Sequence, residues 1–403
     1  MTANLISLAV IMIIATLSPM LAEVIPGKVI PETVFLLLGG AILGPHLVGI
    51  INANEAVDLL SDLGMGFLFL LAGYEIDPKI LLGKQGRRGL RTWLFSFVLA
   101  IGVLYLALFF LPEISSGPFP FALALVLTTT ALGALIPIMK ERGIEKTRVG
   151  TSVLAYGTWG ELGPVLAMAV LLSTRSRWET ALVLLAFVAF CVICAAIPLR
   201  AKRVGDRIYR YFRDHAFNTS QSFVRWVVML LIILLAAASF FHLDIVLGAF
   251  AAGFILRFIL PRGNSILEEK LEAIGYGFLI PVFFVISGAD IDLSAIAASP
   301  LLLIILIIML IVIRMGPIYI VLHHDNTVPG LSNRNKASIA FYCTTALPLI
   351  VAITSVAVNA GTMDSEIASV LISAGAVTMF LMPLLGKIFY EPEEERSDRP
   401  SLS

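Results

Sequence analysis

Long apolar segments alternate with short polar breaks along almost the entire chain. The hydrocarbon core of a bilayer is about 30 Å thick, and an α-helix needs about 20 residues to cross it. Division of the chain at its charged and turn-forming breaks gives thirteen apolar segments of about this length. They cover residues 4–22, 30–50, 58–76, 92–111, 119–139, 149–173, 180–199, 223–241, 243–260, 272–289, 300–322, 337–359 and 366–389. We therefore predict an all-α polytopic membrane protein with about 13 transmembrane helices.

The composition supports this prediction. Hydrophobic residues make up 59% of the 403 residues, charged residues make up 14%, and the mean hydropathy is +0.95. These values exclude an ordinary soluble domain. The first segment has no basic start and no small-x-small cleavage site before Glu23, which indicates a spanning helix rather than a removed signal. The tail at 390–403 is short and polar, so we expect it to be disordered and to add no regulatory domain.

Lysine and arginine are distributed unevenly between the two sets of loops. Loops after odd-numbered segments and the C-terminal tail, together with the segment ends that adjoin them, hold 25 of the 28 basic residues; Arg225, Arg257 and Lys387 are the three at segment ends. Loops after even-numbered segments hold Arg175 and Arg177, and Arg314 lies inside a segment. Because cytoplasmic loops carry the excess of basic residues, we expect a multi-pass protein of the cell (inner) membrane, with its N-terminus outside and its C-terminus in the cytoplasm. An even helix count, with one segment wrongly assigned, is the alternative.

The cysteines predict no special chemistry. Cys191, Cys194 and Cys343 all lie within apolar segments, where thiols usually behave as small hydrophobic side chains. They indicate neither a disulfide framework nor a metal site. We expect no resident cofactor, no nucleic-acid partner and no enzymatic activity.

An internal repeat relates the two halves of the chain. Residues 63–77 and 274–292 both read G-x-G-F-L, then an apolar run, then G-x-x-I-D. The sequence TTAL occurs at Thr129 and again at Thr344, an offset of 215 residues. Similar offsets separate Gly73 from Gly288 and Gly40 from Gly253.

The repeat pairs segments 1 to 6 with segments 8 to 13 and leaves 180–199 as a linker helix. Seven helices separate each pair, so the two six-helix copies must be inverted in the membrane. Inverted repeats are typical of secondary transporters, whose sites lie near the midplane at the repeat interface. The alternative is a membrane protein that inherited the duplication but does not transport.

Two segments carry polar and helix-breaking residues near their middles. Thr128, Thr129 and Thr130 precede Gly133 and Pro137 in one segment, and Thr344 and Thr345 precede Pro348 in its repeat partner. Proline removes a backbone donor, while threonine hydroxyls can satisfy the carbonyl groups that are freed. We predict that both helices are discontinuous and cross near the membrane centre, where half-helix ends and free carbonyls suit a cation. Alternatively, the threonines bond only to their own helices.

One carboxylate and one guanidinium lie inside apolar segments. Glu161 is about twelve residues from either end of its segment, and Arg314 lies slightly to the cytoplasmic side of the middle of its own. Because a charge at the bilayer centre is costly, such residues usually have a function. We predict that Glu161 binds either a proton or a cation, and that Arg314 pairs with it or alternates with the ion. A permanent structural ion pair is the alternative.

Four other acidic residues lie at helix ends, where interfacial anchoring and capping are the favoured roles. They are Glu75, Asp77, Asp290 and Asp292.

Three stretches resemble the monovalent cation/proton antiporters, in particular the sodium/hydrogen exchanger domain of their second branch. They are IPETVFLLLGGAILGPHLVGI at 30–50, LGMGFLFLLAGYEID at 63–77 and PVFFVISGADIDL at 281–293. The resemblance covers essentially the whole chain. It implies a homodimer in which a six-helix core moves as an elevator against a dimerisation part, beside two crossed discontinuous helices. The family's basic residue before the second broken helix matches Arg314.

Applied to this chain, the resemblance assigns about 1–77 and 222–290 to the dimerisation part and about 88–173 and 299–389 to the core. The sequence departs from the family at the site itself. Family members generally carry Asp-Asp, Asn-Asp or Gln-Asp about five residues before a proline, where this chain has Thr158 and Trp159. Glu161 stands about one helical turn nearer the proline.

We therefore predict an antiporter that exchanges a monovalent cation, Na⁺ or K⁺, for protons. Glu161 would carry the ion or proton, and Arg314 would compensate its charge. The polar residues expected around the ion are Thr129, Thr130, Thr158, Thr344 and Thr345. A monovalent cation channel, and a transport-inactive sensor or scaffold of the same fold, are the competing hypotheses.

Overall fold

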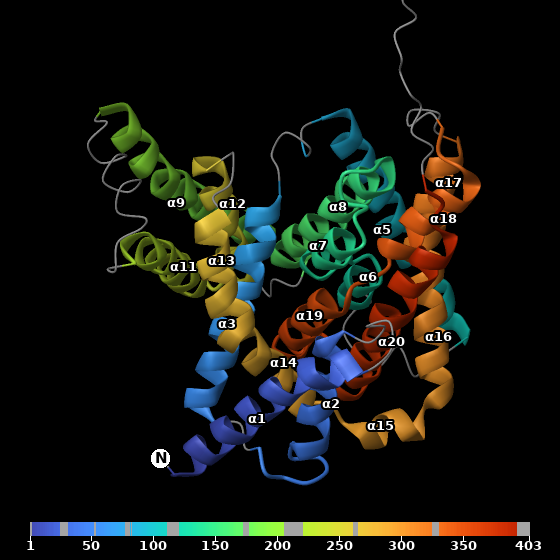
Figure 1. The fold of residues 1–403 in the computed structure, drawn as a ribbon, viewed down its shortest axis with the longest axis horizontal. Helices are drawn as coiled ribbons and strands as arrows, with labels where there is room; N and C mark the ends of the chain where they lie inside the picture. The colour runs from blue at the N-terminus through green and yellow to red at the C-terminus, as the bar shows by residue number, and fades with distance from the viewer. Residues whose placement is uncertain are drawn as a thin grey trace, which may run out of the picture.

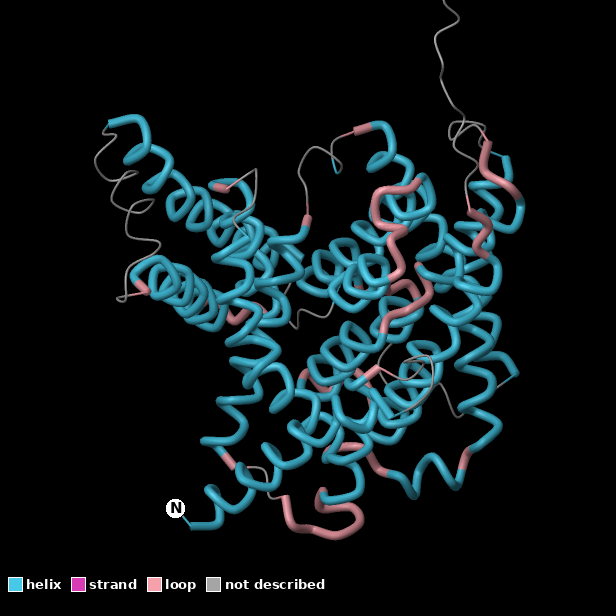
Figure 2. Tube along the Cα trace, viewed as in Figure 1, coloured by secondary structure: helices cyan, strands magenta, loops and turns pink. Residues whose placement is uncertain are grey.

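A computed structural model describes residues 2–24, 31–51, 54–76, 81, 83–110, 121–171, 177–204, 221–260, 265–324 and 330–392. Within these residues the chain is entirely helical, without a β-strand (Figures 1 and 2). Nine helices are long and apolar enough to cross a membrane, and four shorter apolar helices accompany them in the part of the chain that is described. This arrangement supports the predicted all-α membrane fold.

Each of the thirteen predicted segments overlaps a helix. The first seven segments correspond to α1 (Thr2–Val24), α2 (Glu32–Leu43), α3 (Glu55–Glu75), α5 (Lys84–Phe110), α6 (Phe121–Leu127) with α7 (Leu132–Glu141), α8 (Arg148–Leu171) and α9 (Arg177–Val204). The other six correspond to α11 (Ser222–Phe240), α12 (Ile245–Ile259), α13 (Ser265–Ile274) with η2 (Gly275–Leu279) and α14 (Ile280–Ala289), α16 (Pro300–Leu310) with η3 (Ile311–Met315) and α17 (Gly316–His324), α18 (Asn333–Tyr342) with α19 (Leu347–Asn359), and α20 (Ser365–Phe389).

Three features differ from the sequence prediction. Helix α2 ends at Leu43, because Gly44 adopts an extended conformation before Pro45 and the following residues form a turn. A short helix not predicted from hydropathy, α15 (Leu293–Ala298), connects α14 to α16. Two predicted α-helices contain π-helical stretches, η2 and η3, and η3 includes Arg314. Such stretches are rare and frequently occur at functional sites.

The two predicted helix interruptions are present. Residues 128–131 separate α6 from α7, and residues 343–346 separate α18 from α19. Pro348 lies in the first turn of α19. N–H groups in the first turn have no intrahelical acceptor, so the missing N–H of proline costs no hydrogen bond there. The prediction of discontinuous helices is therefore confirmed.

The helices form two groups. In the first group α3 packs on α12, α2 on α14, and α1 and α11 lie beside them. In the second group α5 packs on α8, α18 and α19 on α20, and α6 lies between α8 and α19. The first group lies toward the left and bottom of Figure 1, and the second lies toward the right.

Glycines bring the helices of the first group into backbone contact. A Cβ on Gly73 of α3 would collide with the Phe250 carbonyl of α12, and a Cβ on Gly253 of α12 with the Leu70 carbonyl of α3. Helices α2 and α14 repeat this arrangement, with Gly40 against the Val285 carbonyl and Gly288 against the Leu37 carbonyl. The two helix pairs are thus held by the same reciprocal contact.

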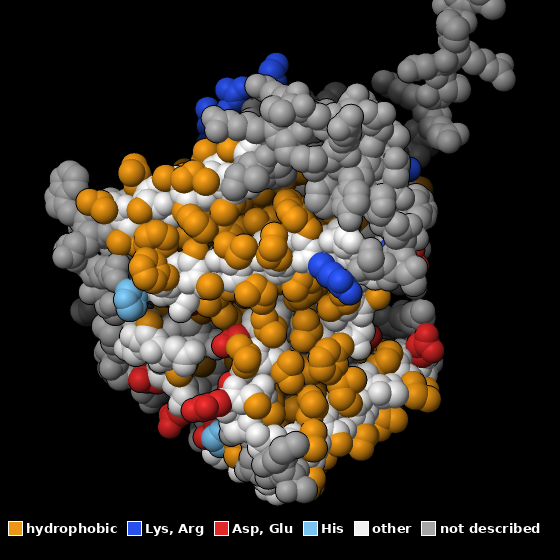
Figure 3. Space-filling model, turned by 90° about the vertical axis from the view of Figure 1, so that its left-hand side faces the viewer, with side chains coloured by type: hydrophobic (Ala, Val, Ile, Leu, Met, Phe, Trp, Pro, Cys, Tyr) orange, Lys and Arg blue, Asp and Glu red, His pale blue; other side chains and the backbone are white. Residues whose placement is uncertain are grey.

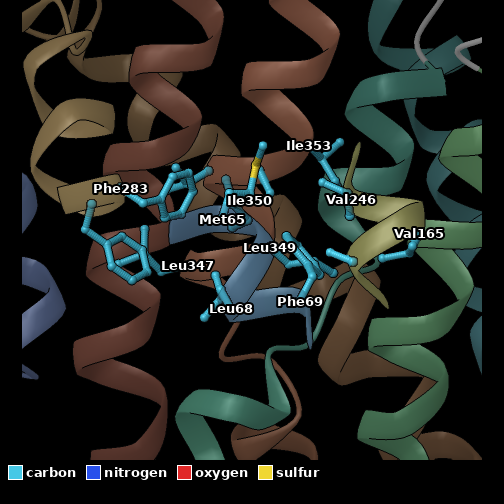
Figure 4. Close-up of a cluster of buried hydrophobic side chains, with 14 of the residues drawn as sticks. Met65, Leu68, Phe69, Val165, Val246, Phe283, Leu347, Leu349, Ile350 and Ile353 are labelled. Atoms are coloured by element: carbon cyan, nitrogen blue, oxygen red, sulfur yellow. The ribbon is translucent and has the colours of Figure 1, made fainter. Parts of the chain in front are cut away.

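The surface where the two groups meet is apolar. In Figure 4, side chains of α3 and α14 in the first group lie close to side chains of α19 in the second. They include Met65, Leu68, Phe69 and Phe283 facing Leu347, Ile350 and Ile353. Such contacts are non-directional, so they do not fix one relative position of the groups as hydrogen bonds would.

Many hydrophobic side chains are exposed on the face of the molecule shown in Figure 3. Helices α1, α9 and α11 expose large hydrophobic side chains, among them Ile13, Leu17, Leu185, Val188, Val192, Ile232, Ile233 and Phe240. An apolar surface of this extent would not be stable in water, and it matches the hydrocarbon environment of a bilayer.

Candidate functional site

The two helix interruptions contact each other in the interior of the second group. The N–H of Ala131 donates to the carbonyl of Thr345 over 2.9 Å, and the hydroxyl of Thr130 donates to the carbonyl of Cys343. The N–H of Thr130 also donates to the carbonyl of Gly160 in α8, over 2.9 Å. Residues more than 200 positions apart therefore satisfy each other's free backbone groups, which stabilises both breaks.

Arg314 lies against this junction and is only 1% exposed. Its Nε donates to the hydroxyl of Thr130 over 2.8 Å and to the carbonyl of Cys343 over 3.3 Å. Its Nη2 donates to the carbonyl of Tyr156 over 3.2 Å. The guanidinium therefore joins α8 to both interruptions through neutral acceptors.

Gly160 makes this position of Arg314 sterically possible. A Cβ at residue 160 would collide with Nη2 of Arg314 and with the side chain of Thr130. The next residue, Glu161, is 3% exposed, and its Oε2 has no hydrogen-bond partner. The backbone N–H of Leu132, at the start of α7, is directed at the Glu161 carboxylate. A helix N-terminus favours a negative charge at this position.

The expected pairing of Glu161 with Arg314 is absent from this structure. Both residues lie in the described part of the chain, and no ion pair joins them there. The hydrogen bonds of Arg314 instead hold its guanidinium on Thr130, Cys343 and Tyr156. The direct pair, which is also the permanent ion-pair alternative, is therefore not made in this conformation, and the role of Arg314 in compensating the charge of Glu161 stays a prediction. Sequence position could not reveal that the free carbonyls at the interruptions compete for the guanidinium.

The predicted threonines occupy two kinds of position. The hydroxyls of Thr128, Thr129, Thr158 and Thr344 donate to carbonyls of their own helices. The hydroxyl of Thr130 instead links the two interruptions, and Oγ1 of Thr345 is buried without a hydrogen-bond partner. Bonding back to the same helix therefore occurs in helices that are nevertheless discontinuous.

Glu161 and Thr345, which each carry an unpartnered oxygen, thus lie next to one short stretch of backbone. The residue that donates to the Thr345 carbonyl is Ala131, and the residue whose N–H faces Glu161 is Leu132. Unsatisfied buried polar atoms are rare and cost about 1–3 kcal/mol each. Glu161 Oε2 and Thr345 Oγ1 are therefore candidates to bind a proton or a cation, among the buried unpartnered oxygens of the described residues.

A cavity of about 800 Å³ opens between the two helix groups. Its walls include Glu32 of α2, Glu75 of α3 and Glu272 of α13 from the first group, facing Lys140 of α7 and Lys387 of α20 from the second. Gly133 and Pro348, next to the interruptions, also line it. The cavity therefore leads from the molecular surface toward the junction.

A smaller cavity of about 370 Å³ lies between α14 and the α19–α20 pair. Its lining includes His46, Ser287, Asp290, Thr354 and Asn359. Asp290 follows the last residue of α14, and the pKa of its carboxyl is raised to about 6, mainly by partial burial, with a smaller contribution from Asp58 and an opposing one from His46.

The helix-end acids only partly follow the predicted anchoring and capping roles. Asp292 caps the start of α15, because its Oδ1 accepts hydrogen bonds from the N–H and hydroxyl of Ser294. Asp77 lies outside the described residues. Glu75 departs from the prediction, because its Oε2 is buried without a hydrogen-bond partner at the wall of the larger cavity. A glutamate at the end of an apolar segment gave no signal that distinguishes these two situations.

Comparisons with known proteins agree on one family. The family model described as "Sodium/hydrogen exchanger, transmembrane" matches residues 9–390. YjbQ of Bacillus subtilis strain 168, a protein classed with the Na⁺/H⁺ antiporters, is 25% identical over 98% of this chain. The chain spans 65% of the length of YjbQ. The Na⁺/H⁺ antiporter NhaS4 of Synechocystis is 26% identical over 65% of this chain and 68% of its own length.

Among solved structures, the sodium proton antiporter MjNhaP1 of Methanocaldococcus jannaschii, determined at pH 8, superposes with a TM-score of 0.62. The alignment covers 96% of this chain and 100% of that one, with 16% sequence identity. At this identity the likeness shows a shared fold.

Proposed function

Because the chain belongs to the sodium/hydrogen exchanger transmembrane family, we propose that it exchanges a monovalent cation, Na⁺ or K⁺, for protons across the inner membrane. The observation that carries the proposal is the buried carboxylate of Glu161, whose Oε2 has no hydrogen-bond partner. A carboxylate in this position can bind a proton or a cation, but not both at once. This competition couples the two fluxes in opposite directions.

The residues around Glu161 have distinct roles in this proposal. The unpartnered hydroxyl of Thr345 and the carboxylate of Glu161 supply oxygen ligands to the cation. Arg314 places a positive charge beside the site while its hydrogen bonds hold the two interruptions together. It therefore stabilises the empty, negatively charged carrier through the surrounding field rather than through a direct ion pair.

The movement that we propose is an elevator motion of the second helix group against the first. The first group corresponds to the expected dimerisation part, at about 1–77 and 222–290, and the second to the core, at about 88–173 and 299–389. The apolar surface between them supports sliding, and the large cavity between them supports access of ions from one side. In the same proposal α9 is the linker and two protomers associate through the first group.

The proposed thirteen-helix topology has two inverted repeats. The reciprocal glycine contacts support it, because the repeat exchanges Gly40 with Gly253 and Gly73 with Gly288. The repeat therefore relates the α3–α12 contact to the α14–α2 contact.

The excess of basic residues indicates that the ends of α7 and α20 lie in the cytoplasm. The larger cavity then faces the cytoplasm, so this conformation is inward-open.

The test of the proposed function is the substitution Glu161→Gln in proteoliposomes. Wild-type protein should collapse an imposed proton gradient when Na⁺ or K⁺ is added, and Glu161→Gln should not, because it neither titrates nor carries charge. Glu161→Asp should retain part of the activity with a changed apparent cation affinity. Glu366→Gln, which alters an exposed carboxylate in the first turn of α20, is the matched control. Near-normal exchange by Glu161→Gln would refute the proposed role of Glu161.

A further inference from the structure

Four polar atoms at the contact between α5 and α8 have no role in the proposed exchange reaction. They are Oγ1 of Thr92, Nε1 of Trp93 and Oγ of Ser96, all in α5, and Nε1 of Trp159 in α8. Each atom is shielded from solvent and has no hydrogen-bond partner among the described residues. Thr92 is 1% exposed, Ser96 is 0% exposed and Trp93 is 6% exposed. Half of the eight shielded, unpartnered side-chain atoms in the described part of the chain thus lie at one helix contact.

The two hydroxyls differ from other hydroxyls in the core helices. A serine or threonine inside a membrane helix commonly donates to a carbonyl about one turn earlier in the same helix. Thr158, Thr344 and Thr378 do so over 2.6 Å, 2.8 Å and 2.8 Å. Thr92 and Ser96 do not form this bond. Their hydroxyls therefore remain able to donate to, and accept from, another polar group.

Two contacts between tryptophan and glycine hold the indole nitrogens at the same interface. A Cβ on Gly163 of α8 would collide with Cε2 of Trp93, the ring carbon bonded to Nε1. A Cβ on Gly89 of α5 would lie 2.9 Å from Cδ1 of Trp159, which is bonded to the Nε1 of that ring. In each helix the tryptophan and the glycine are four residues apart, about one turn. The two contacts are therefore adjacent along the helix pair.

The same side of α8 also accommodates the guanidinium of Arg314. Gly160 leaves room for Nη2 of Arg314 and Gly163 leaves room for the ring of Trp93, and residues three apart are neighbours on one helix face. Helix α5 contacts η3 as well, which contains Arg314. Among the described residues, the partners of this guanidinium are neutral. The unpartnered atoms therefore lie close to a buried charge, whose position inside a membrane is costly without polar surroundings.

The donors and acceptors at this contact define the chemistry of a ligand. An indole N–H can only donate, whereas a hydroxyl both donates and accepts. Water matches this set, because its oxygen accepts from an indole while its hydrogens are donated to hydroxyl oxygens. A halide would use only the donors and would bring a further charge into the interior, which is costly to desolvate.

We propose that Thr92, Trp93, Ser96 and Trp159 form a binding site for ordered water between α5 and α8, beside Arg314. The site is separate from the route proposed for the cation, because none of its four residues lines either cavity described above. The water joins α5 to α8 through hydrogen bonds and gives Arg314 polar surroundings on its α5 side. It therefore stabilises the second helix group in the hydrocarbon of the bilayer.

The first measurement is magnetisation transfer from water to the indole N–H groups. Solid-state NMR of the full-length protein in lipid bilayers, with ¹⁵N in the tryptophan side chains, resolves these groups because the chain has only four tryptophans. Trp93→Phe and Trp159→Phe assign the two signals. Both indoles should receive magnetisation from water in the wild type. Absence of transfer to either indole would overturn the proposal.

The hydroxyl substitutions show whether this water is held at the site. In the double variant Thr92→Val/Ser96→Ala, the transfer should fall by about half or more, because a buried water that typically has about three partners loses two. Thr378→Val removes a buried hydroxyl that already donates to the Gly375 carbonyl, and it should leave both signals unchanged. Undiminished transfer in the double variant would overturn the proposal. If the double variant does not fold, Thr92→Val alone should show a partial loss, and an unchanged transfer would count against the site.

The melting temperature in detergent gives a second test, because a hydrated site and a dry site predict opposite signs. Thr92→Val keeps the shape of the side chain and removes its hydroxyl. At a dry site this would relieve a buried, unsatisfied group and raise the melting temperature. At a hydrated site the water loses a partner, so we expect a lower melting temperature than in the wild type. A rise or no change would overturn the proposal.

A third comparison distinguishes water from an anion. The indole signals should be the same in chloride and in gluconate, since neither ion occupies the site. Signals of Trp93 and Trp159 that shift when gluconate replaces chloride would assign the site to a halide and overturn the assignment to water.

Discussion

At the scale of single residues, Arg314 shows how the interruptions determine the position of a buried charge. A guanidinium has five N–H donors and cannot be deprotonated in a protein. The interruption between α18 and α19 frees the Cys343 carbonyl, and Arg314 binds it together with the Thr130 hydroxyl and the Tyr156 carbonyl. Its hydrogen bonds are therefore made to the backbone scaffold of the site rather than to Glu161.

The first prediction concerns Arg314→Ala. This substitution removes three buried hydrogen bonds that a charged group donates, and each bond of this kind contributes about 1.5–3 kcal/mol to stability. We expect a markedly lower melting temperature in detergent, measured by circular dichroism. Arg314→Lys should have an intermediate melting temperature, because it keeps the charge and some of the donors. A wild-type melting temperature in Arg314→Ala would show that the three hydrogen bonds contribute little to stability.

A second prediction concerns the pH dependence contributed by Asp290. Burial raises its folded-state pKa from 3.8 to about 6, so the folded protein holds this proton over a pH range in which the unfolded chain has lost it. The contribution of this proton to the free energy of unfolding is fully present below about pH 4 and is lost as the pH rises through about 6. Asp290→Asn should therefore stabilise the protein relative to wild type at pH 7 more than at pH 4. Melting temperatures of both proteins across this range check the sign, and a constant difference would contradict it.

At the scale of helices, close backbone contacts distinguish the two groups. Helices α3 and α12 approach until glycine Hα atoms face carbonyl oxygens, as do α2 and α14. Close packing of small residues is a main source of helix association inside a membrane, where apolar side chains gain little by leaving lipid. The first group is accordingly fixed internally, whereas its contact with the second group depends on larger apolar side chains.

Gly253→Ala tests this difference. The added Cβ would collide with the Leu70 carbonyl, and overpacking of this kind typically costs about 1–3 kcal/mol. Gly102→Ala in α5 is the matched control, because nothing lies within 4 Å of the position that its Cβ would occupy. Thermal unfolding in detergent should show a loss of stability for Gly253→Ala and little change or a gain for Gly102→Ala. Equal behaviour of the two variants would contradict the packing argument.

At the scale of the whole molecule, the site lies in the second group and the larger cavity lies between the groups. The cavity gives the junction access to one face of the molecule, and the smaller cavity with Asp290 lies between α14 and the α19–α20 pair. In the elevator motion that we propose, the relative position of the two groups decides which side supplies ions. The proposed exchange cycle then requires no large change within either group.

The orientation of the molecule gives the last prediction. In a background without cysteine, we expect Asn359→Cys, at the exposed end of α19, to react with an impermeant thiol reagent in intact cells. Gln85→Cys, exposed at the start of α5, should react only after permeabilisation. The physical reason is the uneven distribution of basic residues, which predicts that the start of α5 lies in the cytoplasm. The reverse labelling pattern would require the opposite topology.

The sequence alone determined the features that the bilayer enforces. Apolar segments about 20 residues long can only be spanning helices in this composition, and threonine runs followed by proline interrupt such helices. For the same reason Glu161 and Arg314 could be selected, since a charge inside an apolar segment is costly unless it is used. These inferences depend on local sequence, so they needed no knowledge of which helices meet.

Only the tertiary structure decided which groups face each other. The hydrogen bonds of Arg314 to Thr130 and Tyr156, and the approach of Glu75 to the first turn of α7, join residues that are far apart in the sequence. The positions of these side chains follow from helix packing, from the glycines that permit close approach and from the competition of free carbonyls for one guanidinium. Hydropathy and spacing do not contain that information, because they describe each helix separately.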